Sequence, residues 1–345
     1  MKRGIFLSII LGLCLITCIP QVMAQKQSRM EKLLRYLNDN DADKWQKNRE
    51  KLDDETKAYY AEDLSLMDVL NDLWNGQSEQ AATLYFGCYE KAAQSNFPGI
   101  CEGEKIPLSQ IRDKADQSII NLLEASKDKI PFSRALLDSI HATEYPVDSA
   151  MLQRLQNIRE VALLEGMLKA PTPIIYQTYV KEYPNGKFIA QVNASENVRL
   201  YQLVKTAPTP ANFKAFFEDP EMQKYYQDRG PRPYLAEVRT LYDDFLFQRI
   251  DSLKKEGNAT AIRQIIDDYK NTPYLSTGAR THLNDLEYLS EKADFELLKP
   301  AIVNSESLGL LQEFLKTHKY KEFRDQAKNL RAPFILQAIV STPTT

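Results

Sequence analysis

The stretch 170–188, APTPIIYQTYVKEYPNGKF, sets the architecture that we expect, and the stretch 207–225, APTPANFKAFFEDPEMQKY, repeats its plan. Each copy opens with Ala-Pro-Thr-Pro. The hydroxyl groups of Thr172 and Thr209 can accept a backbone N–H at a helix start, and a proline in the first turn has no N–H to lose. The repeated tetrapeptide therefore predicts two equivalent helix starts.

A fixed spacing of apolar residues follows each cap. Counting from the fourth residue after the cap, apolar side chains stand at 0, +3 and +4, a ring at +7 and an aromatic residue at +12. The first four positions share one helix face, and the last opens a second helix after a short turn. The pattern occurs four times, beginning at Tyr176, Phe213, Ile262 and Leu311, with the caps Thr172, Thr209, Asn258 and Ser307.

A capped helical hairpin that recurs every 37 to 49 residues is typical of a helical-repeat array. One hairpin cannot cover its own outer face, so neighbouring hairpins must stack. We therefore expect an all-α protein whose residues 170–340 form an α-solenoid of stacked helical hairpins. An irregular helical bundle is the alternative, because any helical protein contains such spacings.

Residues 25–169 are expected to form a separate N-terminal helical domain. Met30, Leu33, Leu34 and Leu37 mark one face of an amphipathic helix. Helices are predicted over 108–126, 133–142 and 148–168, after an irregular segment around Pro98-Gly99. Residues 341–345 are a short tail.

The string 179–188, YVKEYPNGKF, followed by Ala190 and Ala194, resembles the hairpins of tetratricopeptide-like exported proteins of the bacterial cell envelope. A looser copy begins at Tyr269, and a weaker patch covers 66–92. The resemblance spans about 172–339 and implies an α-solenoid whose first helices line a partner-binding groove. The units are longer than is usual for that family, and the small residues are not kept in every copy.

The N-terminus is typical of an exported protein. Lys2 and Arg3 precede an apolar run from Ile5 to Ile19, and Ala24 ends a cleavage-site pattern. We predict a signal peptide over 1–24 and a location in the periplasm or at the outer membrane. A retained membrane anchor is one alternative. Another is lipidation at Cys18, within a sequence that loosely resembles a lipobox. If the mature protein is attached to a membrane, we expect this lipid anchor to be the means.

Cys88 and Cys101 are the two of the four cysteines that lie beyond this leader. Two cysteines in an exported chain, separated by a short loop, favour a disulfide. A pair of buried, reduced thiols is the alternative.

The sequence contains little that predicts catalysis or a cofactor. The formal net charge is −3, so no broad basic field is present to bind nucleic acid. The three histidines, His141, His282 and His318, have no metal-ligand spacing, and there is no nucleophile elbow or phosphate loop. We expect no enzyme activity, no metal and no cofactor.

The expected function is that of a non-enzymatic adaptor or scaffold that binds another cell-envelope protein. The +1 and +5 positions of the first helices would face that partner, and we name Gln177, Lys181, Lys214, Arg263 and Gln312 as candidate binding residues. A glycan-binding envelope lipoprotein is the first alternative, and a hydrolase without a recognisable motif is the second. The partner, the pathway and the oligomeric state stay open.

Overall fold

The computed structural model describes residues 22–256 and 258–333. These residues form helices and turns, without a strand, so the predicted all-α class is confirmed for them. The chain divides into two compact units, the first ending at Val192 and the second beginning at Asn193. Most of the predicted leader, including Cys18, and the tail 341–345 lie outside the described residues. The predicted boundary at residue 170 coincides with a helix end, because α9 (Ser149–Lys169) stops there.

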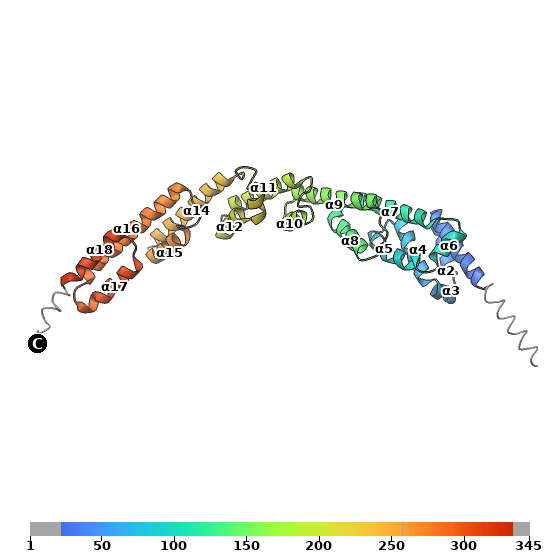
Figure 1. The fold of residues 1–345 in the computed structure, drawn as a ribbon, viewed down its shortest axis with the longest axis horizontal. Coiled ribbons are helices and arrows are strands. Elements are labelled where there is room, and N and C mark those ends of the chain that lie inside the picture. Colours follow the sequence, from blue (N-terminus) through green and yellow to red (C-terminus); the bar gives the residue numbers. More distant parts are fainter. Residues whose placement is uncertain (1–21, 257, 334–345) are drawn as a thin grey trace, which may run out of the picture. The chain divides into compact units, whose positions relative to one another are not determined.

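The described part of unit 1, residues 22–192, opens with a helix over residues 22–38 and continues through nine labelled helices (Figure 1). They are α2 (Ala42–Glu50), α3 (Asp54–Tyr59), α4 (Ala61–Trp74), α5 (Glu79–Ala93), α6 (Phe97–Gly103), α7 (Leu108–Ala125), α8 (Lys129–His141), α9 and α10 (Pro173–Glu182). The predicted apolar face of the first helix is confirmed, because Met30, Leu33, Leu34 and Leu37 are all buried in the core.

The segment that follows α5 is helical, which corrects the expectation of an irregular excursion. Asn96 to Gly99 were read as a loop, but α6 starts at Phe97 and holds Pro98 in its first turn. A proline is tolerated there because the first N–H groups of a helix have no partner within it. Phe97, Ile100 and Cys101 are buried, so this short helix closes the core of unit 1.

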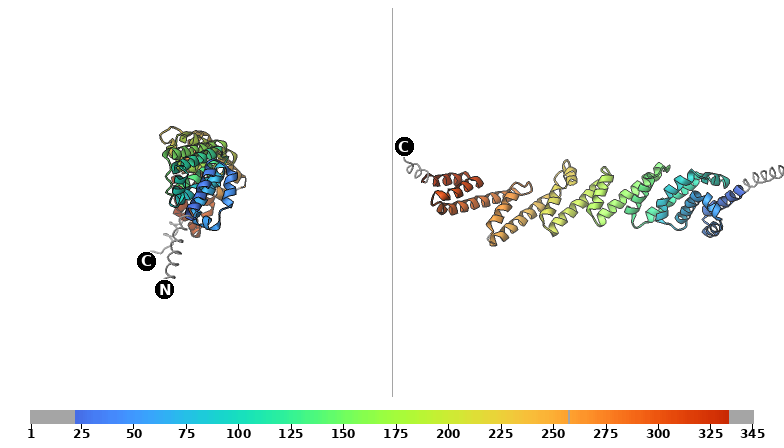
Figure 2. Two further views of the ribbon diagram at one scale, coloured as in Figure 1. Left: turned by 90° about the vertical axis from the view of Figure 1, so that its right-hand side faces the viewer. Right: turned by 90° about the horizontal axis from the view of Figure 1, so that it is seen from below.

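Helix α11 (Ile189–Thr206) spans the division between the units, and unit 2 continues from it (Figure 1). Its further helices are α12 (Pro210–Glu218), α13 (Pro220–Tyr226), α14 (Leu235–Lys255), α15 (Ala259–Tyr269), α16 (Thr277–Ala301), α17 (Leu308–Thr317) and α18 (Lys321–Leu330). Within this unit α14 packs on α15, and α16 packs on α15, α17 and α18. Successive helices reverse direction, so neighbours form antiparallel pairs (Figure 2). Residues 227–234 separate α13, which ends at Tyr226, from α14, which starts at Leu235.

Three of the four predicted helix caps are confirmed. Thr172 Oγ1 accepts the N–H of Ile175 at 3.3 Å, and Thr209 Oγ1 accepts that of Asn212 at 3.2 Å. Asn258 Oδ1 accepts the N–H of Ala261 at 3.0 Å. These bonds are local, so the sequence alone could predict them.

Ser307 does not cap α17 with its side chain. Its hydroxyl group accepts the backbone N–H groups of Val303 and Asn304 at 3.1 and 3.2 Å and donates to the carbonyl oxygen of Asn304 at 2.6 Å. Asn304 Oδ1 in turn accepts the N–H of Ser307. The side chain of Ser307 therefore closes the preceding turn instead of capping the helix.

The predicted apolar stripes face inward. Both the 0 and +3 positions are buried in three of the four units, and in the third Ile265 is buried while Ile262 is half-buried. The +12 aromatics contact the preceding elements: Tyr274 stacks on Phe217 with ring centres 4.3 Å apart, and Phe323 lies 6.0 Å from Phe295 of α16. Phe323 is buried, whereas Phe188, Tyr225 and Tyr274 are half-buried.

In each unit a buried polar side chain on a long helix binds the hairpin that follows. In unit 1, Glu160 of α9 accepts the hydroxyl of Tyr179 at 2.8 Å. In unit 2, Oδ1 of Asn197 on α11 accepts a hydrogen bond from Nε of Arg232 at 2.6 Å. The carboxylate of Glu291 on α16 accepts hydrogen bonds from the backbone N–H groups of Lys319 and Tyr320. Glu160 and Asn197 both stand twelve residues before a capping threonine.

Among residues 22–256 and 258–333, no helix combines the length and apolar character that a membrane span needs.

Candidate functional site

The predicted binding positions are exposed on the first helices. At +1 and +5 of the four units, every side chain faces solvent; the eight are Gln177, Lys181, Lys214, Glu218, Arg263, Asp267, Gln312 and Lys316. The stripes beside them are buried, so each first helix has a clear inner and outer side. Lys214 Nζ lies 3.7 Å from Glu218, and its side chain is 70% exposed, so this pair contributes little to stability.

Arg263 differs from the other predicted residues because it is held by α16. Its Nε donates to Ser290 Oγ at 2.9 Å, and its Nη2 is bound to the carboxylate of Asp294. His318 Nε2 lies 3.1 Å from the other oxygen of Asp294, and its ring stacks on Phe314. These residues line a hollow of about 490 Å³ and connect α15, α16 and the end of α17. The contacts assign Arg263 to packing between helices, which the sequence reading did not anticipate.

The predicted disulfide is not present in the structure: Cys88 and Cys101 are both free. Cys88 lies on α5 with its sulfur 3.5 Å from Ser65 Oγ, and Cys101 lies on α6 inside the core. Burial raises the pKa of the Cys101 thiol to about 12. The thiol is therefore protonated at neutral pH, and Cys101 acts as a small apolar core residue.

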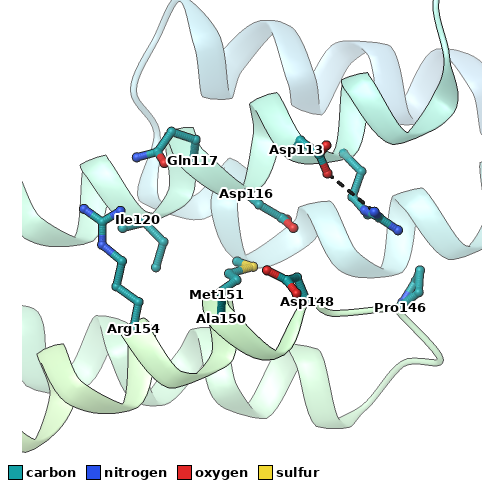
Figure 3. Close-up of a pocket in the computed structure, with 10 residues that line it drawn as sticks. Asp113, Asp116, Gln117, Ile120, Pro146, Asp148, Ala150, Met151 and Arg154 are labelled. Atoms are coloured by element: carbon teal, nitrogen blue, oxygen red, sulfur yellow. Dashed lines mark hydrogen bonds and ion pairs between the residues drawn. The ribbon is translucent and has the colours of Figure 1, made fainter.

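A polar hollow of about 660 Å³ lies in unit 1 between α7 and the start of α9 (Figure 3). Helix α7 contributes Asp113 and Asp116, while the start of α9 contributes Met151 and Arg154. The α8–α9 connection adds Pro146 and Asp148. The side chain of Asp116 reaches from α7 toward Asp148 and Met151.

Asp116 is buried although it is a carboxylate. Its side chain lies beside the core residues Ala115 and Ile119, and the residue is only 7% exposed. Oδ1 accepts the hydroxyl of Tyr145 at 2.5 Å, and the Tyr145 oxygen lies 3.4 Å from that of Tyr85 on α5. Burial raises the pKa of Asp116 to about 6, against the hydrogen bond from Tyr145 and the charge of Arg112, which lower it.

The charges around the hollow are only partly balanced. Arg112 pairs with Asp113 at 3.5 Å, and Arg154 pairs with Glu124 at 2.8 Å. Asp116 and Asp148 form no ion pair with any described residue. Asp148 holds the N-cap position of α9 yet makes no capping hydrogen bond with its side chain. Asp116 and Asp148 therefore face a hollow whose two arginines are each paired with another carboxylate.

The sequence reading missed this hollow, although one signal was present. The buried face of α7 carries Ile111, Ala115, Ile119, Ile120 and Leu123. Asp116 precedes Ile120 by one helical turn, so it stands where that face requires an apolar residue. A charged residue in such a position indicates a partner or a function. The position of Asp148 across from it depends on tertiary packing, which the sequence does not reveal.

Comparisons with protein families, with curated proteins and with solved structures find no match to this chain.

Proposed function

We propose that this chain is an exported helical-repeat protein that binds another protein of the bacterial cell envelope as a non-enzymatic adaptor. One observation carries the proposal: all eight side chains at +1 and +5 of the four first helices are exposed, while the stripes beside them are buried. A row of helices with solvated polar side chains is the surface that helical-repeat proteins use to bind partners.

Three features support a stacked repeat arrangement of tetratricopeptide-like hairpins. Equivalent side-chain caps start three of the first helices. An aromatic ring of one hairpin stacks on the stripe of the hairpin before it, as Tyr274 does on Phe217. Buried polar residues of α9 and α11 bind the hairpin that follows, as Glu160 and Asn197 do at equivalent positions. The second and third features connect a hairpin to its neighbour, which is how repeat proteins gain stability.

The location follows from the N-terminus. A basic start, an apolar run and an alanine-terminated cleavage pattern over residues 1–24 favour export across the inner membrane. We place the mature chain in the periplasm or at the outer membrane, where a protein partner would meet it.

Charge reversal tests the proposed surface. The double variant Lys181→Glu, Lys214→Glu changes one exposed first-helix position in each unit, and we expect at least a tenfold drop in partner recovered with the purified chain from envelope extract. The control double variant Lys32→Glu, Lys292→Glu changes exposed lysines on other helices, again one in each unit. It should recover the partner as the unmodified chain does. Equal recovery with both double variants would contradict the proposal.

A further inference from the structure

We propose that the hollow between α7 and α9 binds the ammonium group of a lysine side chain on the partner protein. This inference rests on the proposed function, because it names the chemistry by which a partner is held. It concerns residues that lie apart from the exposed first-helix positions, and its test needs no partner.

The geometry of Asp116 supplies the first argument. The residue is more than nine-tenths buried, and its Oδ1 is already occupied by the Tyr145 hydroxyl. Oδ2 has no hydrogen-bond partner among the described residues, and the side chain is directed into the hollow (Figure 3). This oxygen is open to the hollow, so a donor that enters the hollow can bind a carboxylate whose other surroundings are largely apolar.

The charge balance supplies the second argument. Arg112 pairs with Asp113 at 3.5 Å, and Arg154 pairs with Glu124 at 2.8 Å. Asp116 and Asp148 are left facing the hollow, so its unbalanced charge is negative. The pKa of Asp116 is raised by burial first, and the charges of Asp113 and Asp148 raise it further. A bound cation would compensate both carboxylates at once.

The arrangement suits an ammonium better than a guanidinium. A guanidinium binds best when both oxygens of one carboxylate accept from it in parallel. Tyr145 occupies one oxygen of Asp116, so that mode is blocked there. An ammonium is compact and donates three hydrogen bonds in different directions, so it can be shared between Asp116 and Asp148.

The wall of the hollow suits the rest of a lysine side chain. Ile120, Pro146 and Met151 contribute apolar surface beside the carboxylates. A lysine buries its methylene stem along apolar surface while its charged end meets polar groups. The volume of about 660 Å³ also leaves room for the backbone that carries the lysine.

Binding should depend on pH. The groups that face Asp116 are Tyr145 of the α8–α9 connection, Tyr85 of α5, Arg112 and Asp113 of α7, Asp148 before α9, and Arg154 of α9. The carboxyl of Asp116 changes charge nearest neutrality, with a pKa of about 6. The affinity for an ammonium should therefore fall as the pH is lowered from 7.5 to 5.

The experiment measures small probes on the purified full chain by ligand-observed NMR. The probe is N-acetyl-lysine methylamide, and its Nε-acetylated form keeps the methylene stem but carries a neutral, larger amide in place of the ammonium. We expect the charged probe to bind at least about tenfold more tightly. Equal binding of the two forms would overturn the proposal. Equal affinity for n-butylamine, which lacks a peptide backbone, would overturn the assignment to a lysine of a protein.

Variants locate the binding. Asp148→Asn removes an exposed charge, so the fold is kept. The double variant Asp116→Asn, Asp148→Asn should lower the affinity for the charged probe at least tenfold. Asp43→Asn removes an exposed charge on α2, outside the hollow, and should leave affinity unchanged. Undiminished binding to Asp148→Asn and to the double variant would exclude this hollow. Equal partner recovery with the two lysine double variants, together with intact probe binding, would instead contradict the proposed function alone.

Discussion

The guanidinium of Arg159 on α9 binds both oxygens of Glu182 at the end of α10, with Nε at 2.5 Å and Nη2 at 2.8 Å. Arg159 is only 2% exposed, and its Nη1 also donates to the carbonyl oxygen of Ile130 and to Ser133 Oγ on α8. One side chain thus connects three successive helices of unit 1. Burial would raise the pKa of Glu182, but the hydrogen bonds and charge of Arg159 outweigh it and lower the pKa.

Arg159→Met should destabilise unit 1 by about 3 kcal/mol, because the part-buried Glu182 loses its bidentate donor and keeps only the longer pair with Arg134 at 3.3 Å. Arg154→Met, on the same helix, removes an exposed pair with Glu124 and should cost less than about 1 kcal/mol. Urea unfolding measures both free energies. Similar losses in the free energy of unfolding for the two variants would show that the Arg159 contacts do not stabilise unit 1 by this amount.

The contribution of Asp116 to the free energy of unfolding should change with pH, and it should disfavour the folded state at neutral pH. Its folded pKa, about 6, lies above the ordinary value of 3.8, so the folded state binds more protons between these values. The Asp116 contribution therefore favours folding as pH falls from 7.5 toward 4. Comparing Asp116→Asn with the unmodified chain across this range isolates it. Parallel stability curves would contradict the raised pKa.

The two cysteines beyond the leader should be free thiols of unequal reactivity. Alkylation at pH 8 followed by peptide mass spectrometry should modify Cys101 only after unfolding, because its pKa of about 12 and its burial keep it protonated and covered. After unfolding, without reductant, both Cys88 and Cys101 should be labelled. A peptide pair joined through these two residues would restore the disulfide that the sequence suggested.

Arg263→Glu should destabilise unit 2, because it places a carboxylate against Asp294. Lys214→Glu reverses a charge that is 70% exposed and should change the melting temperature little. Thermal unfolding of the two single variants separates a packing role from a surface role. Equal melting temperatures of the two variants would indicate that Arg263 has a surface role, as the other predicted binding residues do.

The features that the sequence predicted are those set by near neighbours in the chain. The caps at Thr172 and Thr209 and the stripe from Met30 to Leu37 depend on residues within two helical turns. The disulfide failed because a short sequence separation does not bring two sulfurs together when α6 folds as a helix. The contacts of Arg263 and the hollow beside Asp116 come from helices that meet only in the fold, so spacing along the chain could not predict them.

Site-specific photo-crosslinking in growing cells tests the proposed function most directly. A photoreactive residue at Gln177, Lys181, Lys214 or Gln312 should attach the chain to one and the same envelope protein, identified by mass spectrometry. The same residue at Lys32 or Lys292, which are equally exposed on other helices, should attach to it at no more than background level. A partner that crosslinks to all six positions alike, or only to the two control positions, would contradict the proposal that the first helices form the binding surface.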